Sequence, residues 1–305
     1  MNGSVLRPKL WITIASLAFI GVAVQQQSGQ LQKLSLTRES WCLLVLGFGL
    51  TWLSILINGS AWRSLLQWMG HNPEGLTIVP LFVRSNLLKY LPGGIWHFVE
   101  RLRQLRPVIG GGPALAGVML DPLLIVAASL LLMTFGGWQR GLVLIAPLPA
   151  LLLLPRWREP LLLRLERSKS AQLQSAGAGA LEVQGSGRGG YPWTPLMAEL
   201  MFVLVRFAGF FCCVLAFGLS APSAWTWIAC FGLAYAVGLV VPGAPGGLGV
   251  FEATLLLRLD GAVAEAPLLA VVLSFRLIST LADVLAAGAL PVDRSLLRWW
   301  SSRCR

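Results

Sequence analysis

Charged side chains are scarce in this sequence. Only 12% of its 305 residues are Asp, Glu, Lys or Arg and 56% are hydrophobic, whereas an average soluble domain carries about 25% charged residues. The deficit extends along the whole chain. An ordinary soluble domain is therefore excluded. We expect an all-α, polytopic transmembrane helical bundle, because helices satisfy their own backbone hydrogen bonds in lipid.

Cysteine and histidine are also rare. The five cysteines show no C-x-x-C spacing and four lie in apolar runs, which favours a packing role over disulfides. Of the two histidines, His97 stands one helical turn from Glu100, but a single such pair supplies too few ligands for a metal site. The sequence also lacks a nucleophile elbow and a P-loop. We therefore expect no metal, no cofactor and no enzymatic activity.

Basic residues outnumber acidic ones, and the formal net charge is +11. They cluster beside apolar runs, at the N-terminus, at 101–106, at 156–169 and at the C-terminus. This distribution is typical of cytoplasmic loops under the positive-inside rule, with anionic lipid headgroups as partners. No aromatic and basic surface motif indicates nucleic acid as a partner. We expect a multi-pass protein of the plasma (inner) membrane with both termini in the cytoplasm.

Seven apolar runs approach the length of about 20 residues that a transmembrane helix needs. They are Leu10–Val24, Trp41–Asn58, Ala114–Gly136, Gly141–Pro155, Leu196–Ser220, Ala224–Val241 and Ala266–Leu290. Another run, Leu76–Leu91, contains a proline and two basic residues and is expected to be re-entrant. We expect Ala61–Met69 to lie in the membrane interface and Gly249–Leu259 to form a short helix. The chain would make about seven or eight crossings.

A polar stretch at 156–194 separates two apolar halves. It begins with basic residues and continues with Gly, Ser, Ala and Gln without hydrophobic periodicity, which predicts a flexible cytoplasmic linker. Residues 1–155 form the first transmembrane half, with a Pro-Gly-Gly segment at 91–101. Residues 195–305 form the second half, with another Pro-Gly-Gly segment at 241–254 and a basic tail. We expect the halves to be pseudo-repeats, each with a broken or re-entrant segment.

The two Pro-Gly-Gly segments share a pattern. Each continues with a phenylalanine and then a glutamate: Pro92, Gly93, Gly94, Phe98 and Glu100 in the first, and Pro245, Gly246, Gly247, Phe251 and Glu252 in the second. Interrupted segments at matching places in two halves indicate a transporter's central site. Irregular backbone persists in hydrocarbon only where protein or a wet cavity covers it, and a helix starting after the break offers free N–H groups to an anion. The alternative is a tight surface loop, with Glu252 capping its own helix.

Charged residues also occur inside the predicted spans. Arg276 lies about halfway through the last span, and Asp283 follows seven residues later on the same face. An arginine at the bilayer centre costs at least ~2.5 kcal/mol, so we expect it to find Glu252, Asp283 or a lipid phosphate; a structural ion pair is the alternative. A structural role is expected for three other charges: Asp121, Glu199 and Arg206. Four residues are expected to ring the cytoplasmic mouth and grip phosphate: His97, Glu100, Arg101 and Arg103.

On these residues, the sequence resembles a known family. KYLPGGIWHFVERL, and later VPGAPGGLGVFEATLL followed by an arginine-containing span, are similar to the lysylphosphatidylglycerol synthase transmembrane-region family. This is the flippase-like domain of the multiple peptide resistance factor and of many stand-alone membrane proteins. The resemblance covers essentially the whole chain and implies movement of lipid or polyprenyl-linked headgroups across the membrane. The residues that match the family's motif are Pro92, Gly93, Gly94, Pro245, Gly246, Gly247, Gly249, Glu252 and Arg276.

The resemblance also bears on partners. The KYLPGGIWH form is similar to stand-alone members associated with sugar-transferring enzymes, which implies a glycosyltransferase or another lipid-modifying enzyme as a partner. The soluble aminoacyl-transferring domain of the resistance factor is not in this sequence, so the resemblance does not imply synthase chemistry.

Three functions follow as hypotheses. The first is a translocator of anionic phospholipid or polyprenyl-linked headgroups, with the two Pro-Gly-Gly segments, Arg276 and Asp283 along the substrate path. The second is an accessory or scaffold subunit for a lipid- or glycan-modifying enzyme, docked through the basic linker. The third is a proton-coupled carrier of small solutes, in which transport responds to pH through Glu252.

Overall fold

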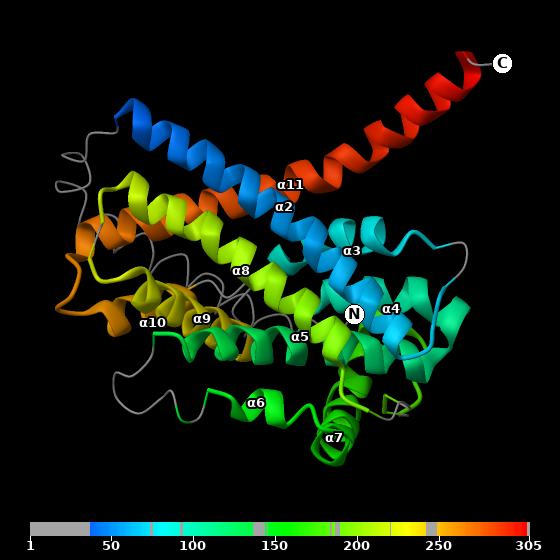
Figure 1. Cartoon of the computed structure of the whole chain (residues 1–305). Helices are drawn as coiled ribbons and strands as arrows, with labels where there is room; N and C mark the ends of the chain where they lie inside the picture. Colours follow the sequence, from blue (N-terminus) through cyan, green and yellow to red (C-terminus); the bar gives the residue numbers. More distant parts are fainter. Residues whose placement is uncertain are drawn as a thin grey trace.

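The computed structural model (Figure 1) describes most of the chain after residue 36. The described residues are 37–73, 76–91, 94–136, 144, 146–183, 185–186, 190–219, 221–241 and 249–303, with side chains described up to residue 289. Within these ranges the regular structure is entirely helical, as the composition predicts. The predicted span Leu10–Val24 lies outside the described residues.

Four helices in the described part of the chain are long and apolar enough to cross a membrane. They are α2 (Arg38–Trp68), α5 (Gly111–Met133), α8 (Trp193–Ala216) and the Glu265–Ala289 portion of α11 (Glu265–Arg303). A fifth apolar helix, α9 (Ala224–Val240), is shorter. The chain is thus a helical protein whose long helices suit a bilayer.

Two of the described helices, α2 and α9, begin with a side-chain cap. The Thr37 hydroxyl accepts a hydrogen bond from the Ser40 N–H at 3.2 Å, at the start of α2. The Ser223 hydroxyl accepts one from the Thr226 N–H at 3.4 Å, at the start of α9. Each bond satisfies a backbone donor that the helix itself leaves unpaired.

Helices α2 and α8 run side by side along much of their length (Figure 1). Small residues permit this approach, because a Cβ added at Gly47 of α2 would lie 2.9 Å from the carbonyl oxygen of Gly209 in α8. Close helix packing through glycine is typical of membrane proteins, in which lipid gives helices little hydrophobic reason to associate. On the other side of α8, α5 packs against α4, α8 and α9.

An aromatic cluster joins the second-half helices. Phe210 of α8 lies 5.1 Å from Phe231 of α9 and 5.3 Å from Phe275 of α11, measured between ring centroids. Phe251 belongs to α10 (Val250–Leu259) and lies 5.7 Å from Phe231. These edge-to-face and tilted contacts fix α10 against α9 and α11. Glu252 follows Phe251 in sequence, and Arg276 follows Phe275. Both residues are therefore held where α10 meets α11.

Helices begin directly after both Pro-Gly-Gly segments, as expected. In the first half, α3 (Ile78–Asn86) and the 3-10 helix η1 (Leu87–Tyr90) lead into the break, and α4 (Trp96–Ile109) follows it. In the second half α10 follows the break. The breaks' own residues Pro92, Gly93, Pro245, Gly246 and Gly247 lie outside the described residues. Gly94 and Gly249 are described, with φ of 63° and 83°, left-handed values that favour glycine.

Three expectations about the elements need correction. The predicted span Trp41–Asn58 and the predicted interfacial helix Ala61–Met69 are one helix, α2, because no helix breaker separates them and Ala61, Trp62, Leu65 and Leu66 are buried. The predicted span Ala266–Leu290 agrees within one residue at each end with the Glu265–Ala289 portion of α11, and the helix itself continues to Arg303, an end that projects from the body in Figure 1. Of the predicted span Gly141–Pro155, residues 141–143 and 145 lie outside the described residues, and the remainder holds only the short α6 (Leu148–Leu151).

The third correction concerns the predicted flexible linker at 156–194. Its first part is α7 (Pro155–Leu173), followed by a π-helical turn at Gln174–Ala178. The reason is a buried anchor: the Arg158 side chain is fully buried, its Nη1 donates to the Gly190 carbonyl at 2.9 Å, and its Nη2 donates to Ser186 Oγ at 3.1 Å. Arg158, which the composition of this stretch predicts to be exposed to solvent, is therefore buried and holds Ser186 and Gly190 against α7.

Candidate functional site

The centre of the site is an ion pair between α10 and α11. Arg276 Nε donates to Glu252 Oε1 at 2.5 Å, and the guanidinium lies 5.0 Å from the centre of the Phe251 ring. Glu252 is 2% exposed, in the first turn of α10, whereas the Arg276 side chain is 23% exposed. Of the three partners expected for Arg276, Glu252 is the one that it contacts in the structure.

A second charge contact lies two turns along α11. Asp283 Oδ2 accepts a hydrogen bond from the Tyr90 hydroxyl at 2.6 Å and lies 2.6 Å from Lys89 Nζ. Asp283 is 1% exposed, and Lys89 and Tyr90 are the last residues of η1, just before the first break. Burial lowers the pKa of Lys89 against the opposing attraction of Asp283.

These contacts bring both break segments to one face of one helix. The last turn before the first break is bonded to Asp283, and the first turn after the second break is bonded to Arg276. Seven residues of α-helix advance by about 10 Å, so the two anchors are two turns apart on the same side. We call Lys89, Tyr90, Glu252, Arg276 and Asp283 the α11 charged face.

A third cation stands near this face. Arg206 of α8 is 7% exposed, its Nη1 donates to Ser54 Oγ of α2 at 3.4 Å, and its guanidinium lies 5.8 Å from the Phe275 ring. Its charge acts on both Lys89 and Asp283. Together with Lys89 and Arg276 it makes three cations against the carboxylates of Glu252 and Asp283. The cluster therefore carries an excess of positive charge, which attracts an anion.

In the first half, Arg101 differs from expectation. It is 2% exposed, and its Nη1 donates to Asp121 Oδ2 at 3.1 Å, while its Nε donates to Ser85 Oγ at 3.0 Å. The guanidinium also lies 3.8 Å from the centre of the Phe82 ring. Arg101 is thus a buried partner of Asp121 and does not line a cytoplasmic mouth, because the buried carboxylate of α5 draws it inward.

The neighbouring predicted residues lie nearer the surface of α4. Glu100 Oε1 accepts a hydrogen bond from Gln104 Nε2 at 3.0 Å, and Arg103 is exposed. His97 is half-buried, and its Nδ1 has no hydrogen-bond partner among the described residues. The described residues contain no group of three or more side chains that could hold a metal ion.

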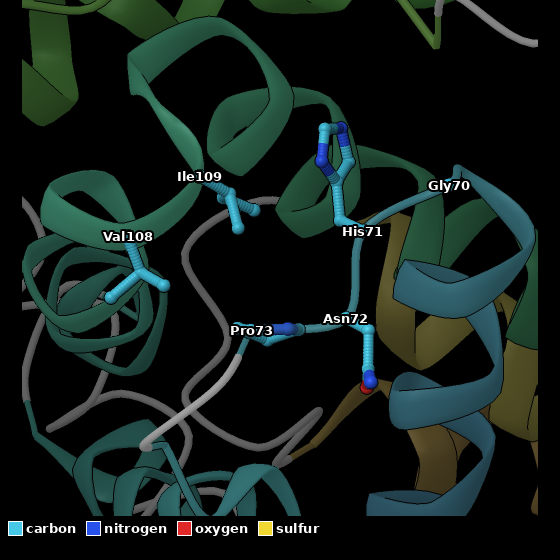
Figure 2. A pocket seen from close by; sticks show the side chains of 6 residues that line it. All are labelled: Gly70, His71, Asn72, Pro73, Val108 and Ile109. Carbon is cyan, nitrogen blue, oxygen red and sulfur yellow. The ribbon is translucent and has the colours of Figure 1, made fainter.

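Two hollows lie on the first half. One, of about 480 Å³, runs between α3 and α4 and combines apolar and polar side chains: Leu76, Thr77, Pro80, Leu81, Arg84, Ser85, Leu88, Glu100 and Gln104. The other, of about 430 Å³, is shown in Figure 2, where Val108 and Ile109 line the α4 side and His71 and Pro73 the loop side. Neither hollow is lined by a residue of the α11 charged face.

The α11 charged face and its surroundings include three residues that the sequence alone does not predict: Lys89, Tyr90 and Arg206. A lysine interrupting an apolar run directly before a break is a usable signal for Lys89, because such a charge requires a partner. For Arg206 the only signal is its position inside a span. Comparison with models of known protein families and with curated proteins finds no match to this chain.

Proposed function

We propose that this protein is a non-enzymatic, flippase-like translocator that moves anionic phospholipid or polyprenyl-linked headgroups across the plasma (inner) membrane. The observation that carries the proposal is the α11 charged face, where two helix-interrupting segments are bound to one helix within a cluster of net positive charge. Interrupted segments that meet at a charged site are the arrangement from which transporters build a central substrate path.

The charged face supplies a binding mechanism. Lys89 and Arg276 keep 21% and 23% of their side chains exposed, so an incoming phosphate can reach both cations. Phosphate competes with Glu252 for Arg276, since a guanidinium binds carboxylate and phosphate with the same bidentate geometry. Once Arg276 binds the headgroup, Glu252 loses its partner and the ion pair no longer joins α10 to α11. Binding of the cargo would thereby loosen the segment that encloses it.

The membrane arrangement belongs to the same proposal. Leu10–Val24 adds a crossing to the four long helices and α9. The two halves are pseudo-repeats about the linker. The basic residues at both termini and on α7 face the cytoplasm, where anionic lipids attract them.

The experiment is a translocation assay in reconstituted vesicles. The purified full-length chain is incorporated into vesicles containing fluorescent phosphatidylglycerol, and transbilayer movement is followed by quenching with a membrane-impermeant reductant. Arg276→Ala should slow movement about tenfold, because a lost charge-assisted hydrogen bond is worth about 1.5–3 kcal/mol. Arg63→Ala, which removes the same side chain from an exposed position of α2, serves as the matched control and should keep the wild-type rate.

Two results would overturn the proposal. One is a wild-type rate equal to that of protein-free vesicles. The other is a protein-dependent rate that Arg276→Ala and Lys89→Ala leave unchanged. Phosphatidylcholine, whose headgroup has no net charge, separates selective translocation of anionic lipids from unselective mixing.

A second candidate, an accessory subunit that docks a lipid- or glycan-modifying enzyme, is favoured by one observation. The ordered helix α7 carries an exposed basic surface made of Arg156, Arg164 and Arg167 beside Trp157, which is 56% exposed. Replacing the three arginines with serine should remove a co-purifying enzyme while leaving translocation in vesicles intact. A copurified enzyme that is retained by this variant would exclude α7 as the docking site.

A further inference from the structure

A separate ionisable cluster lies in the core, where α4, α5 and α8 meet. Asp121 of α5 is 3% exposed and Glu199 of α8 is 1% exposed, α5 packs against α8, and the two carboxyl groups interact with each other. Asp121 Oδ2 accepts from Arg101 Nη1 at 3.1 Å. Asp121 Oδ1 and Glu199 Oε2 are buried oxygens to which no described group donates a hydrogen bond.

The contact between the two carboxyl groups requires a proton. Ionised carboxylates only accept hydrogen bonds, so two of them cannot bond to each other unless one carries hydrogen. A single proton on Glu199 would let it donate to Asp121 and would provide a donor at oxygens that otherwise have none. Leaving both groups ionised would instead place two like charges side by side in an apolar interior, which costs several kcal/mol.

The charge balance around the pair leads to the same conclusion. Arg101 is the one cation acting on both carboxyl groups in the described chain, and it balances only one of them. Tyr235 of α9 also lies within the field of Glu199. The α3 side contributes the neutral Ser85 and Asn86, and α2 contributes the neutral Trp62, 5.2 Å from the Arg101 guanidinium. A bound proton makes the cluster neutral.

We propose that Asp121 and Glu199 form a proton-binding site in the membrane interior, with Arg101 as its fixed counter-ion. The proton comes from water and bridges α5 and α8. Its release leaves two adjacent carboxylates that repel each other across the helix interface. Proton binding is thus coupled to the packing of α5 against α8, and this inference does not rest on lipid translocation.

The test is infrared spectroscopy of the purified full-length protein in lipid nanodiscs at neutral pH. A protonated carboxyl group gives a C=O stretching band, resolved from that of carboxylate, which shifts on exchange into D₂O. We expect this band in the wild-type protein and its loss in Glu199→Gln, in which a carboxamide of nearly the same shape cannot ionise. Glu252→Gln is the matched control and should retain the band, because Glu252 is a buried glutamate outside this cluster and is paired with Arg276.

A measurement without substitution guards against variants that fail to fold. Wild-type protein carrying ¹³C in its glutamate carboxyl groups, or separately in its aspartate carboxyl groups, should show an isotope shift of the band for one of the two labels. Absence of any protonated-carboxyl band from the wild-type protein at neutral pH overturns the proposal. A band that persists in both Glu199→Gln and Asp121→Asn overturns it as well. Lipid translocation enters neither readout, so failure of the proposed function would leave this result intact.

Discussion

Single residues in this protein are paired over long distances in sequence. Asp283 accepts a hydrogen bond from Tyr90, which lies 193 residues earlier in the sequence, and also contacts the adjacent Lys89. Arg101 and Arg276 likewise find carboxylates on other helices. In a membrane, a charged side chain without a partner costs at least ~2.5 kcal/mol, so each pair constrains which helices can be neighbours.

The pH response of His97 is the prediction at this scale. Burial, followed by the charges of Arg101 and Lys89, lowers the pKa of His97 well below its ordinary 6.5. The unfolded chain therefore binds a proton below about pH 6.5 that the folded protein does not bind. Stability should fall as the pH drops below that value, by up to about 1.4 kcal/mol per pH unit.

Thermal unfolding in detergent at pH 7.5 and pH 5.5 measures this effect. His97→Gln, which cannot titrate, should lose less stability over the interval than the wild-type protein. Equal losses for the two proteins would contradict the assigned environment of His97. The comparison is made between proteins at each pH, so other titrating groups cancel.

At the residue scale, some contacts of the site can be predicted from the sequence. The pairing of Arg276 with Glu252 follows from the cost of an isolated intramembrane charge and from the proximity of the second break. The burial of Arg101 does not follow, because a basic residue in ERLRQLR has the local composition of an exposed helix and only the position of Asp121 in the fold draws it inward.

At the scale of elements, the most extensive contact between described helices is the one between α2 and α8. A Cβ at Gly47 would meet Gly209 O at 2.9 Å and Cys212 Cβ at 3.1 Å, whereas one at Gly49, on the same helix, would meet nothing within 4 Å. The two glycines therefore form a matched pair for testing the interface, with the same intrinsic helix propensity and different surroundings.

Gly47→Ala should destabilise the protein by about 1–3 kcal/mol, because overpacking forces the two backbones apart. Gly49→Ala should be neutral or stabilising, by up to about 1 kcal/mol, since alanine favours helix over glycine. Denaturation of both variants in mixed detergent micelles gives the two values. A loss of stability in the Gly49 variant equal to that in the Gly47 variant would show that the α2–α8 contact at Gly47 does not control the outcome.

Element prediction succeeds where hydrophobic composition decides. The helices α5, α8 and α9 start and end within four residues of their predicted bounds. Prediction fails where a tertiary contact determines the structure. Helix α7 is held by the buried Arg158, and the local sequence has no hydrophobic periodicity that would predict a helix there. The sequence also predicts two helices where the structure has the single helix α2. The sequence changes there from apolar to amphipathic, but such a change does not by itself end a helix.

For the whole molecule, membrane orientation is the testable consequence of the charge distribution. Helix α8 joins the basic α7 region to the loop before α9, so these flanking segments should lie on opposite sides of the bilayer. Ser175 and Ala221 are exposed positions on the two sides of α8.

Cysteine labelling tests this orientation in a variant without its native cysteines. In intact cells an impermeant maleimide should label Ala221→Cys, whereas Ser175→Cys should react only after the membrane is permeabilised. Labelling in the reverse order would place α7 outside the cytoplasm and would contradict the positive-inside assignment. Labelling of both positions in intact cells would show that α8 does not span the membrane.

The length of α2 has a consequence for the surrounding lipid. Its 31 residues extend over about 46 Å, whereas the hydrocarbon core of a bilayer is about 30 Å thick. Its C-terminal turns are enclosed by protein, while Trp41, Val45 and Leu46 near its start are exposed. A helix longer than the slab must lean or extend beyond the hydrocarbon core. Bilayers of different acyl-chain length should therefore change the tilt of this flank, and with it the angle at which α8 crosses the membrane.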